Sequence, residues 1–386
     1  MIFSLSDRTQ YSSLEDAIYL NQASLGLTGQ PAVSAMHAYL DDVGRHGNMN
    51  LTDAQEVSLF APLRKNAAAL MNCPPEQLAI MSSAGEMLSQ LPYLFNVPTG
   101  SKFLSVSTDF PAITRPWIAY AETHDISLQF INEQIDIDLT DALIKAIDES
   151  TAVVAVSYVQ FSTGTLSDIY RLREATRKVG AHLVVDVTQA AGALPIDAKG
   201  WEADIVVSSG YKWLGGQGGI GLAVVAPSFL KRTPPAPGWM GAPDPFDMQA
   251  TKLPLADDAR RFTQSTMSYM SMAGLTVSMG ELLAMGVENI EAHAKSLAKL
   301  LHEKLTGTGW TPFRSIDDKA ASAHIITLGN PASNVENTLR TIRNANIVCS
   351  SRNNRIRVSI AHFNDENDIQ AFVKILQKGG SNYLNP

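Results

Sequence analysis

The sequence predicts an α/β protein in which a mostly parallel, helix-covered sheet is followed by a smaller α+β domain. Three observations support this fold class. The chain has 386 residues, well above the roughly 150 of a typical domain, so it has room for two packed units. Apolar residues make up 45% and charged residues 18%, a globular composition that excludes a mainly disordered chain. Short β-branched segments alternate with segments of helical periodicity, which is the pattern of βαβ units.

Six short apolar segments mark the expected strands of the sheet. They lie at residues 78–81, 102–106, 151–159, 182–187, 203–209 and 219–225. The segments between them carry apolar residues at helical spacing, as from Leu166 to Val179, where Ser167 and Asp168 are start signals and Gly180 is a stop signal. Strands that alternate with helices in this way predict parallel pairing with helices on the faces of the sheet.

A proline-rich stretch at 232–254 precludes a regular helix or a central strand, so we expect an ordered loop there. The pattern after it predicts two long helices, a strand, a helix, a second strand and a last helix. These elements are expected at residues 270–285, 287–305, 324–328, 335–344, 355–360 and 366–377. This mixture predicts the smaller α+β domain.

Composition and charge limit the partners. The net charge of −8 provides no general basic field for nucleic acid or an anionic membrane, which favours a small-molecule partner. The first residues lack the basic start and apolar core of a secretory signal, and the uncharged stretch 262–280 is too polar to span a bilayer. Cys73 and Cys349 form neither a disulfide framework nor a metal-ligand pair. We therefore expect a cytoplasmic protein without bound metal.

Lys212 and Asp186 are the candidate catalytic residues. Asp186 ends the apolar segment HLVVD, and Lys212 follows the next one in DIVVSSGYK, just before a glycine-rich run. Strand ends of an open α/β sheet form the crevice in which ligands bind, so both side chains are expected there. This pair suits pyridoxal phosphate, because the amine forms an imine with the aldehyde and the carboxylate keeps the pyridine nitrogen protonated. Taken singly, Lys212 also fits a solvated lysine and Asp186 a turn or cap residue.

The block VVDVTQAAGALPIDAKGWEADIVVSSGYKWLGGQGGIGL resembles the cofactor segment of the class V aminotransferase superfamily, whose members are fold type I enzymes dependent on pyridoxal 5'-phosphate (PLP). The resemblance runs from YLNQASLG at 19–26 to IRVSIAHFNDENDI at 356–369 and points to the branch of cysteine desulfurases, isopenicillin N epimerase-like enzymes and kynureninases. It implies a large domain with a mostly parallel seven-stranded sheet and a smaller α+β C-terminal domain. The implied division is an N-terminal segment at 1–18 that packs with the small domain, a PLP-binding domain at 19–260, and a linker helix with the small domain at 261–386.

The resemblance also implies roles in cofactor binding. Lys212 matches the imine lysine and Asp186 the partner of the pyridinium nitrogen. Gln189 matches the side chain that hydrogen-bonds the phenolic oxygen of the cofactor, and Ser209 matches a phosphate-binding serine. Phe110 stands where the superfamily places a ring on the pyridine face; it stacks but transfers no proton, unlike the histidine of cysteine desulfurases. The open alternatives are a helix-start polar residue for Gln189 and a core residue that begins a helix for Phe110.

The segment AIMSSAGEMLSQL places small residues between a strand and a helix, where free backbone N–H groups and the helix dipole attract phosphate. Ser83, Ala84 and Gly85 resemble the phosphate cup of the family. Many relatives carry threonine in place of Ala84, so we expect backbone amides to replace that hydroxyl. Independently of the family, Ser82 or Ser83 also fits a simple helix N-cap.

A homodimer with shared active sites is implied by two further segments. RRFTQSTMSYM resembles the stretch that crosses the dimer interface, with Thr266 at the position that reaches the phosphate in the neighbouring subunit. GWMGAPDPFDM resembles a kynureninase-like loop in which Trp239 lines the same shared site. An exposed loop tryptophan is the competing interpretation of Trp239.

The substrate is expected to meet two segments. Arg357 matches the arginine that binds the substrate α-carboxylate, which a planar guanidinium grips through two hydrogen bonds. Asn21, Ala23 and Ser24 resemble the N-terminal stretch that closes the substrate pocket, although this polar stretch also fits a turn.

Cysteine chemistry is not expected. Desulfurases of this branch place their nucleophilic cysteine in the loop after the arginine that matches Arg352, but here that loop, 353–356, reads NNRI. Cys349 is therefore interpreted as a buried structural thiol. Arg352 and Arg355 also fit surface charges.

The predicted function is that of a PLP-dependent enzyme acting on an amino acid through external aldimine and carbanion chemistry, with Lys212 as the base. An aminotransferase or aminotransferase-like enzyme ranks first, a carbon–sulfur β-lyase second and an amino acid epimerase third. A noncatalytic relative would need neither Lys212 nor Asp186. A nucleotide-binding α/β enzyme lacks support because the early part of the chain has no G-x-G-x-x-G turn.

Overall fold

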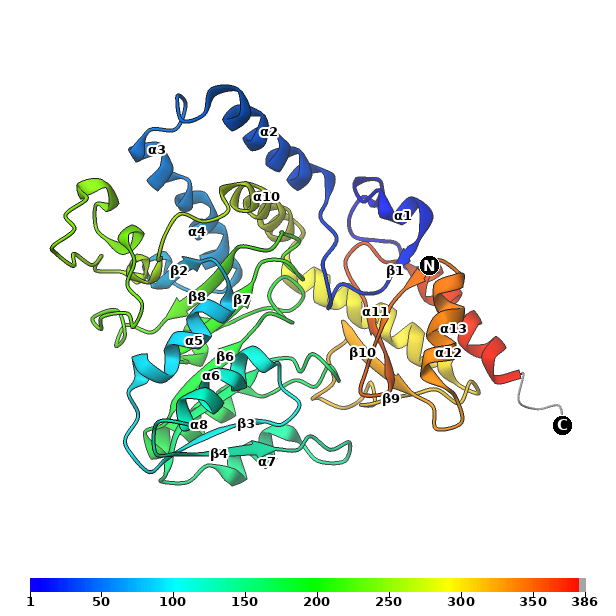
Figure 1. Cartoon of the computed structure of the whole chain (residues 1–386). Helices are drawn as coiled ribbons and strands as arrows, with labels where there is room; N and C mark the ends of the chain where they lie inside the picture. The colour runs from blue at the N-terminus through cyan, green and yellow to red at the C-terminus, as the bar shows by residue number, and fades with distance from the viewer. Residues whose placement is uncertain (382–386) are drawn as a thin grey trace.

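The computed structural model describes residues 1–381, and a seven-stranded sheet lies at its centre (Figure 1). The strand order is β2-β8-β7-β6-β5-β3-β4. The pairs that β8 makes with β2 and β7 are antiparallel, and the other pairs are parallel. The strands are β2 (Leu78–Met81), β3 (Ser101–Val106), β4 (Ile126–Ile131), β5 (Thr151–Ser157), β6 (His182–Asp186), β7 (Ile205–Ser209) and β8 (Gly221–Val225). This confirms the mostly parallel seven-stranded sheet.

The sheet is buried on both faces, which explains why its strands appear as continuous apolar runs. In β5, Val154 and Val156 belong to one apolar core, whereas Val153 and Ala155 belong to another on the opposite face. Strand β4 lies at the edge of the sheet and is only half-buried, with polar Ser127 and Gln129 in its sequence. The weak apolar signal of this edge strand is why no segment at 126–131 is predicted from the sequence.

Helices cover the two faces and form three layers with the sheet (Figure 1). Helices α5 (Ala84–Phe95) and α6 (Pro111–Ala121) contribute to one core. The opposite core includes α4 (Phe60–Leu70), α7 (Leu139–Ala146), α8 (Ile169–Val179) and α10 (Tyr269–Met285). The shorter or peripheral helices are α1 (Ser13–Asp16), α2 (Gln30–His46), α3 (Asp53–Ser58) and α9 (Ala198–Trp201).

Local capping chemistry sets the ends of α8 as predicted. Asp168 is its N-cap and accepts a hydrogen bond from the backbone of Arg171 at 3.1 Å. Gly180 ends the helix with a φ of 74°, a left-handed conformation that glycine adopts without strain. Leu166 lies before this N-cap, so the apolar series belongs to the helix only from Ile169 onward.

The C-terminal region contains a second, antiparallel sheet with the order β12-β13-β10-β9. Its strands are β9 (Thr311–Pro312), β10 (Ile325–Gly329), β12 (Ser350–Arg352) and β13 (Arg355–Ser359). Helices α11 (Val287–Leu305), α12 (Val335–Asn344) and α13 (Glu366–Ser381) pack with it around a third core. This is the α+β arrangement predicted for the end of the chain.

The first residues of the chain lie against this C-terminal region (Figure 1). Strand β1 (Ile18–Tyr19) pairs with β11 (Ile347–Val348), and the Arg8 guanidinium donates to Asp368 at 2.8 Å. These contacts agree with the segment 1–18 expected to pack on the small domain. The division itself, with boundaries at 18 and 260, stays a prediction, and residues 382–386 of its last part lie outside the described residues.

Two further predictions concern irregular and apolar segments. The stretch 232–254 contains two short 3-10 turns, η3 (Trp239–Gly241) and η4 (Pro245–Asp247), and no regular helix or strand, as expected. Within residues 1–381 no single helix has the length and apolarity to cross a membrane; α10 and α11 meet that test only when joined across a 73° bend.

Candidate functional site

A cavity of about 210 Å³ lies at the carboxyl ends of β6 and β7, beside the N-terminal ends of α5 and α6. Ligands of open α/β sheets bind at such strand ends. The predicted residues that line the cavity are Ser83, Ala84, Gly85, Phe110, Asp186, Gln189, Ser209 and Lys212. The fold therefore brings eight of the predicted cofactor residues together from four separate segments.

Lys212 is buried, with 6% of its surface exposed, which excludes the solvated-lysine alternative. Its Nζ lies 5.2 Å from the centroid of the Phe110 ring and 5.8 Å from that of Tyr211. Burial lowers the pKa of Lys212 from 10.5 to about 8; the Asp186 carboxylate opposes this, and Arg357 and Arg352 reinforce it. With a pKa of about 8, roughly a tenth of the lysine is neutral at pH 7, far more than at the ordinary pKa, and the neutral amine is the nucleophilic form.

Asp186, the last residue of β6, is equally buried. Its Oδ1 accepts a hydrogen bond from the backbone N–H of Thr188 at 2.7 Å. Burial raises the pKa of Asp186, and the Thr188 hydrogen bonds and the charge of Lys212 lower it in part. A buried carboxylate with so few hydrogen-bond donors is stabilised when a cationic group of a ligand lies beside it.

A second buried carboxylate, Asp109, was not predicted from the sequence. It accepts hydrogen bonds from the backbone N–H and the hydroxyl of Ser157 at 2.9 and 2.6 Å, from Gln160 Nε2 at 3.1 Å and from the Phe110 N–H at 2.7 Å. It thereby ties the end of β5 to the residue before α6. Its side-chain partners, Ser157 and Gln160, are about fifty positions away in the sequence, so no local motif marks it.

The N-terminus of α5 forms one wall of the cavity. Ser83 is the N-cap, and its Oγ accepts the Glu86 N–H at 3.0 Å, so the N-cap alternative is confirmed while the hydroxyl hydrogen remains available as a donor. Strand β8 approaches this turn closely: a Cβ on Gly221 would lie 2.2 Å from the Ser83 carbonyl carbon. A Cβ on Gly85 would meet only the Ser83 hydroxyl, at 3.7 Å, so open space lies over this helix end.

The other cavity residues have fixed orientations. Gln189 Nε2 donates to the Ala23 carbonyl at 3.0 Å and its Oε1 accepts from Trp213 at 2.9 Å; no helix begins at Gln189, so that alternative is wrong. Phe110 is the N-cap residue of α6, is 38% exposed, and meets Phe161 edge-on with 5.6 Å between centroids. It begins a helix but is not a core residue.

The end of β7 adds Ser209, which also faces the cavity. Its backbone N–H donates to the Thr188 hydroxyl at 3.1 Å. Thr188 thus links Ser209 to Asp186, whose carboxylate it also binds. Thr188, Tyr211, Ser157 and Phe161 line the cavity but were not predicted from the sequence.

Arg357, on β13, is 1% exposed; it does not line the Lys212 cavity itself but contacts Phe161, which does. It donates to the Phe161 carbonyl at 2.7 Å, to the Ser24 hydroxyl at 2.5 Å and to the Ser350 hydroxyl at 3.2 Å. These acceptors are neutral. Burial and the nearby Arg352 lower the pKa of Arg357.

The predicted N-terminal pocket segment lies between the two sheets. Ser24 contacts Arg357, and the Ala23 carbonyl accepts from Gln189. Asn21 bridges to Ser359, and its buried Oδ1 has no hydrogen-bond partner within the described chain. Ala23 and Ser24 thus connect a cofactor residue and a substrate residue predicted separately.

Trp239 and Thr266 do not line the Lys212 cavity of their own chain. Trp239 is 37% exposed, so its exposed-loop alternative agrees with the structure, and its Nε1 donates to the Ser265 hydroxyl at 3.2 Å. A Cβ on Gly238 would lie 1.8 Å from the Gln264 oxygen, so the two segments touch. Trp239 and Thr266 therefore belong to one surface region, and their roles across a dimer stay predictions.

Cys349 is partly buried against the C-terminal core, and burial raises the pKa of its thiol to about 12. Such a thiol is a poor nucleophile, in agreement with a structural role. No cluster of three His, Cys, Asp or Glu side chains suited to a metal ion occurs in the described part of the chain.

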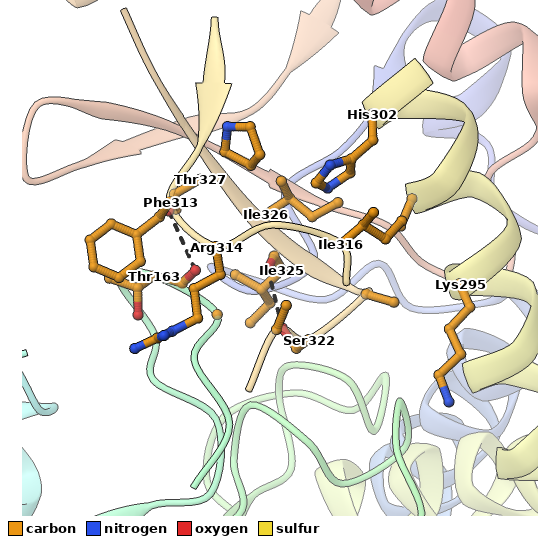
Figure 2. Close-up of a pocket in the computed structure, with 15 residues that line it drawn as sticks. Thr163, Lys295, His302, Phe313, Arg314, Ile316, Ser322, Ile325, Ile326 and Thr327 are labelled. Carbon is orange, nitrogen blue, oxygen red and sulfur yellow. Dashed lines mark hydrogen bonds between the residues drawn. The ribbon is translucent and has the colours of Figure 1, made fainter. Parts of the chain in front are cut away.

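A separate cavity of about 170 Å³ lies between α11, the C-terminal sheet and Gly164 (Figure 2). His302, Lys295 and Arg314 line it, and none of the predicted site residues does. The Lys295 ammonium forms an ion pair with Glu291 at 2.5 Å.

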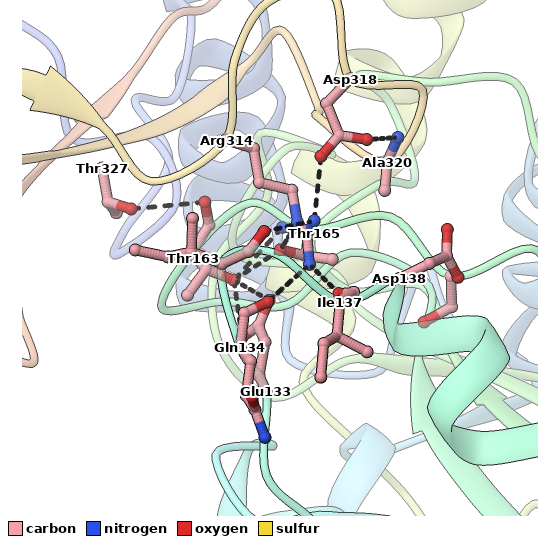
Figure 3. A network of polar contacts seen from close by, with 12 residues as sticks. Glu133, Gln134, Ile137, Asp138, Thr163, Thr165, Arg314, Asp318, Ala320 and Thr327 are labelled. Carbon is pink, nitrogen blue, oxygen red and sulfur yellow. Dashed lines mark hydrogen bonds and ion pairs between the residues drawn. The ribbon is translucent and has the colours of Figure 1, made fainter. Parts of the chain in front are cut away.

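Arg314 also anchors the segment that carries Phe161. Its guanidinium donates to Thr165 at 2.8 Å and to Asp318 at 2.9 Å and lies 3.9 Å from Glu133 (Figure 3). The Glu133 carboxylate accepts from Thr163 at 3.0 Å. This network fixes the 161–165 turn between the two sheets and so positions the Phe161 carbonyl that Arg357 uses.

Comparison with known proteins matches this geometry to one family. The family description "Aminotransferase class-V" matches residues 18–372. The chain is 24% identical over 367 residues to "Uncharacterized aminotransferase YcbU" of Bacillus subtilis, with 94% of each chain covered. It is 24% identical over 393 residues to a kynureninase of Bacillus cereus, with 96% of this chain and 90% of the kynureninase covered.

Solved structures show the same fold. Two structures of C-DES, a cystine C–S lyase, superpose with TM-scores of 0.88 and 0.87 at 20% identity. They cover 97% and 96% of this chain and 100% of the C-DES chains. One of them carries glycine covalently linked to a PLP cofactor.

The cavity fits PLP on its own chemistry. A buried amine with a lowered pKa, a buried carboxylate with few donors, and a helix N-terminus under open space match the aldehyde, the pyridinium and the phosphate of that molecule. Lys212, Asp186 and the Ser83–Gly85 turn would hold these three groups. Together with the family match across residues 18–372, this fit leads to one conclusion: the chain belongs to the class V aminotransferase family and is a PLP-dependent enzyme, a transferase or a lyase.

Proposed function

We propose that the protein is an aminotransferase or aminotransferase-like enzyme that moves the α-proton of an amino acid. The observation that carries the proposal is the buried Lys212 amine in the cavity, whose pKa the Asp186 carboxylate raises and the Arg357 guanidinium lowers. The bound cofactor supplies an electron sink that acidifies this proton. Lys212 supplies the amine that holds the cofactor aldehyde and then the base that takes the proton from the α-carbon.

The other residues of the site bind and orient. Asp186 keeps a proton on the pyridine nitrogen, because a carboxylate favours the protonated form of a base beside it. The backbone N–H groups at Ala84 and Gly85, with the hydroxyls of Ser83 and Ser209, bind the phosphate. Arg357 grips the substrate α-carboxylate.

Phe110 supports transamination over desulfuration. Its ring faces the Lys212 amine at 5.2 Å and has no proton to give, so the amine alone serves the α-carbon from that side. Cys349, with a pKa of about 12, offers no thiolate for persulfide chemistry. With PLP bound, Lys212 would be placed to carry the proton from the α-carbon to the cofactor, and hydrolysis by water would then release a 2-oxo acid and leave the amino group on the cofactor.

A carbon–sulfur β-lyase is the second candidate, because β-elimination begins with the same proton removal and needs no protein thiol. The fold shared with the cystine C–S lyase C-DES is compatible with it. An epimerase, in which Lys212 returns the proton to the α-carbon, ranks third.

One experiment separates these reactions. The purified, cofactor-loaded enzyme is incubated with a panel of amino acids, and the products are quantified. Conversion of the cofactor to its pyridoxamine form with release of a 2-oxo acid supports the proposal. Release of ammonia, pyruvate or sulfide without pyridoxamine supports the lyase, and racemisation alone supports the epimerase; either result contradicts the first candidate.

We also propose that the enzyme works in the cytoplasm as a homodimer. The touching segments at Trp239 and Thr266 form an exposed region suited to reach the phosphate site of a second subunit. Analytical ultracentrifugation of the holoenzyme should give the dimer mass. A monomer that retains full activity would contradict the shared site.

A further inference from the structure

Two arginines whose charges act on Lys212, Arg352 and Arg357, form no ion pair within the described chain, in contrast to the buried Arg314. Among the ion pairs formed within residues 1–381, none includes Arg352 or Arg357. Arg357 is almost fully buried and Arg352 is half-buried. Burying cationic groups without a counter-ion is costly, so this pair is prepared for a ligand that supplies negative charge.

The two guanidinium groups are neighbours. Both donate to the same atom, the Ser24 hydroxyl oxygen, from 2.5 Å for Arg357 and 3.5 Å for Arg352. The other described hydrogen bond of Arg352 goes to the carbonyl of the adjacent Ser351 at 2.6 Å. Arg352 therefore has donor groups left over beside the site expected for the substrate carboxylate.

Charge in this region is unbalanced before a substrate arrives. Arg352 and Arg357 both lower the pKa of Lys212, and Arg352 lowers the pKa of Arg357, so the three cations are close enough to interact electrostatically. The Asp186 carboxylate is the counter-charge that acts on Lys212. One α-carboxylate at Arg357 still leaves Arg352 without an anion.

Arg355 lies on the same hairpin as Arg352 but has different surroundings. Its guanidinium lies over the Phe313 ring at 5.1 Å, and it does not contribute to the pKa of Lys212. Strand pairing places Arg352 opposite Arg355, so the two side chains share a hairpin but have different surroundings. Arg355 is thus a matched control.

We propose that Arg352 binds a second acidic group of the substrate, so that the enzyme acts on an α-amino acid whose side chain ends in an anion, such as a dicarboxylic amino acid. This inference rests on the proposed function, which places the α-carboxylate at Arg357. The two acidic groups of one short substrate then neutralise two adjacent arginines.

Binding of unreactive acids tests the proposal without turnover. Calorimetric titration of the holoenzyme with succinate and glutarate is compared with titration by butyrate, for the wild type, Arg352→Gln, Arg352→Lys and Arg355→Gln. We expect the diacids to bind the wild type and Arg355→Gln about 10- to 100-fold more tightly than butyrate, the range of a charge-assisted contact. Arg352→Gln should reduce this preference to below about threefold, and Arg352→Lys should keep part of it, because the ammonium retains the charge.

Equal affinities of the wild type for diacids and butyrate, or an unchanged preference in Arg352→Gln, would overturn the proposal. So would a loss of affinity for butyrate and diacids alike in Arg352→Gln, since both arginines would then hold one carboxylate. The proposed function fails separately, when no amino acid of any charge yields pyridoxamine even though the diacid preference and its dependence on Arg352 are present.

Discussion

Arg314 and Arg357 are both buried between the two sheets, but the chain neutralises only one of them. Arg314 donates to the Asp318 carboxylate at 2.9 Å and lies 3.9 Å from the Glu133 carboxylate. Arg357 has only neutral acceptors among the residues described, such as the Phe161 carbonyl and the Ser24 hydroxyl. The charge of Arg314 is therefore neutralised within the fold, whereas the charge of Arg357 is left for an anionic ligand to neutralise.

The two buried carboxylates differ in the same way. Asp109 accepts from Ser157, Gln160 and Phe110, and its four hydrogen bonds connect the segment at 109–110 to the segment at 157–160. Asp186 has a hydrogen-bonded neighbour in Thr188 and otherwise faces the cavity. The two carboxylates are similarly buried but have different roles. Asp109, whose oxygens are fully hydrogen-bonded within the chain, stabilises the fold, whereas Asp186, which has few donors, is available to bind a ligand.

The largest effect on chemistry is expected from Asp186→Ala. With PLP bound, Asp186 would be the counter-ion of the pyridinium, and removal of one partner of such a buried pair costs about 3 to 5 kcal/mol, so turnover should fall at least about a hundredfold. Asp186→Glu should keep part of the activity because it retains a carboxylate. Steady-state kinetics of the cofactor-loaded variants measure both, and normal turnover of Asp186→Ala would remove this residue from the site.

Arg314→Ala should show the opposite pattern. It leaves Glu133 buried without its cation, so the free energy of unfolding should drop by about 3 to 5 kcal/mol. Turnover per folded molecule should fall far less than in Asp186→Ala, because Arg314 lies outside the Lys212 cavity and acts on it only through the segment that carries Phe161. Chemical denaturation measures the free energy of unfolding, and kinetics normalised by active-site titration give the turnover per folded molecule. An inactive variant of unchanged stability would contradict the structural role given to Arg314.

Arg357→Ala should lower kcat/KM for amino acids by about ten- to hundredfold, the equivalent of about 1.5 to 3 kcal/mol from a lost charge-assisted hydrogen bond. Arg357→Lys should recover only part, since an ammonium lacks the two-pronged geometry. The bound cofactor should remain, because its contacts lie elsewhere. Amines without a carboxylate serve as the control: they should react equally with wild type and variant, and equal losses for both substrate types would make Arg357 structural.

The pH dependence of cofactor uptake tests how Asp186 and Arg352 act on the pKa of Lys212. Neutral lysine is the reactive form, and burial lowers the pKa of Lys212 to about 8, so the rate at which apoenzyme takes up PLP should rise through that pH and level off above it. Because Asp186 raises this pKa and Arg352 lowers it, Asp186→Asn should move the midpoint down and Arg352→Gln should move it up. Stopped-flow absorbance provides the profile; a midpoint near the ordinary 10.5 would contradict the burial argument.

Local patterns were sufficient for much of the fold and for the centre of the site. Buried strands leave continuous apolar runs, and Lys212 and Asp186 follow directly from their places at strand ends. Edge strand β4 was missed because none of its residues is fully buried and two of them, Ser127 and Gln129, are polar. Asp109 and the Arg314 network were missed because their partners come from distant segments, and the missing charge partners of Arg352 become visible only when the hairpin is placed against Ser24.

The central claim is that Lys212 holds the cofactor covalently. Borohydride reduction of the purified holoenzyme, followed by peptide mass spectrometry, tests it directly. We expect a pyridoxyl phosphate mass increment on Lys212 alone, and no increment after reduction of Lys212→Ala, which should still fold and bind PLP noncovalently. An unchanged increment in that variant, or one on another lysine of the wild type, would contradict the assignment of the site.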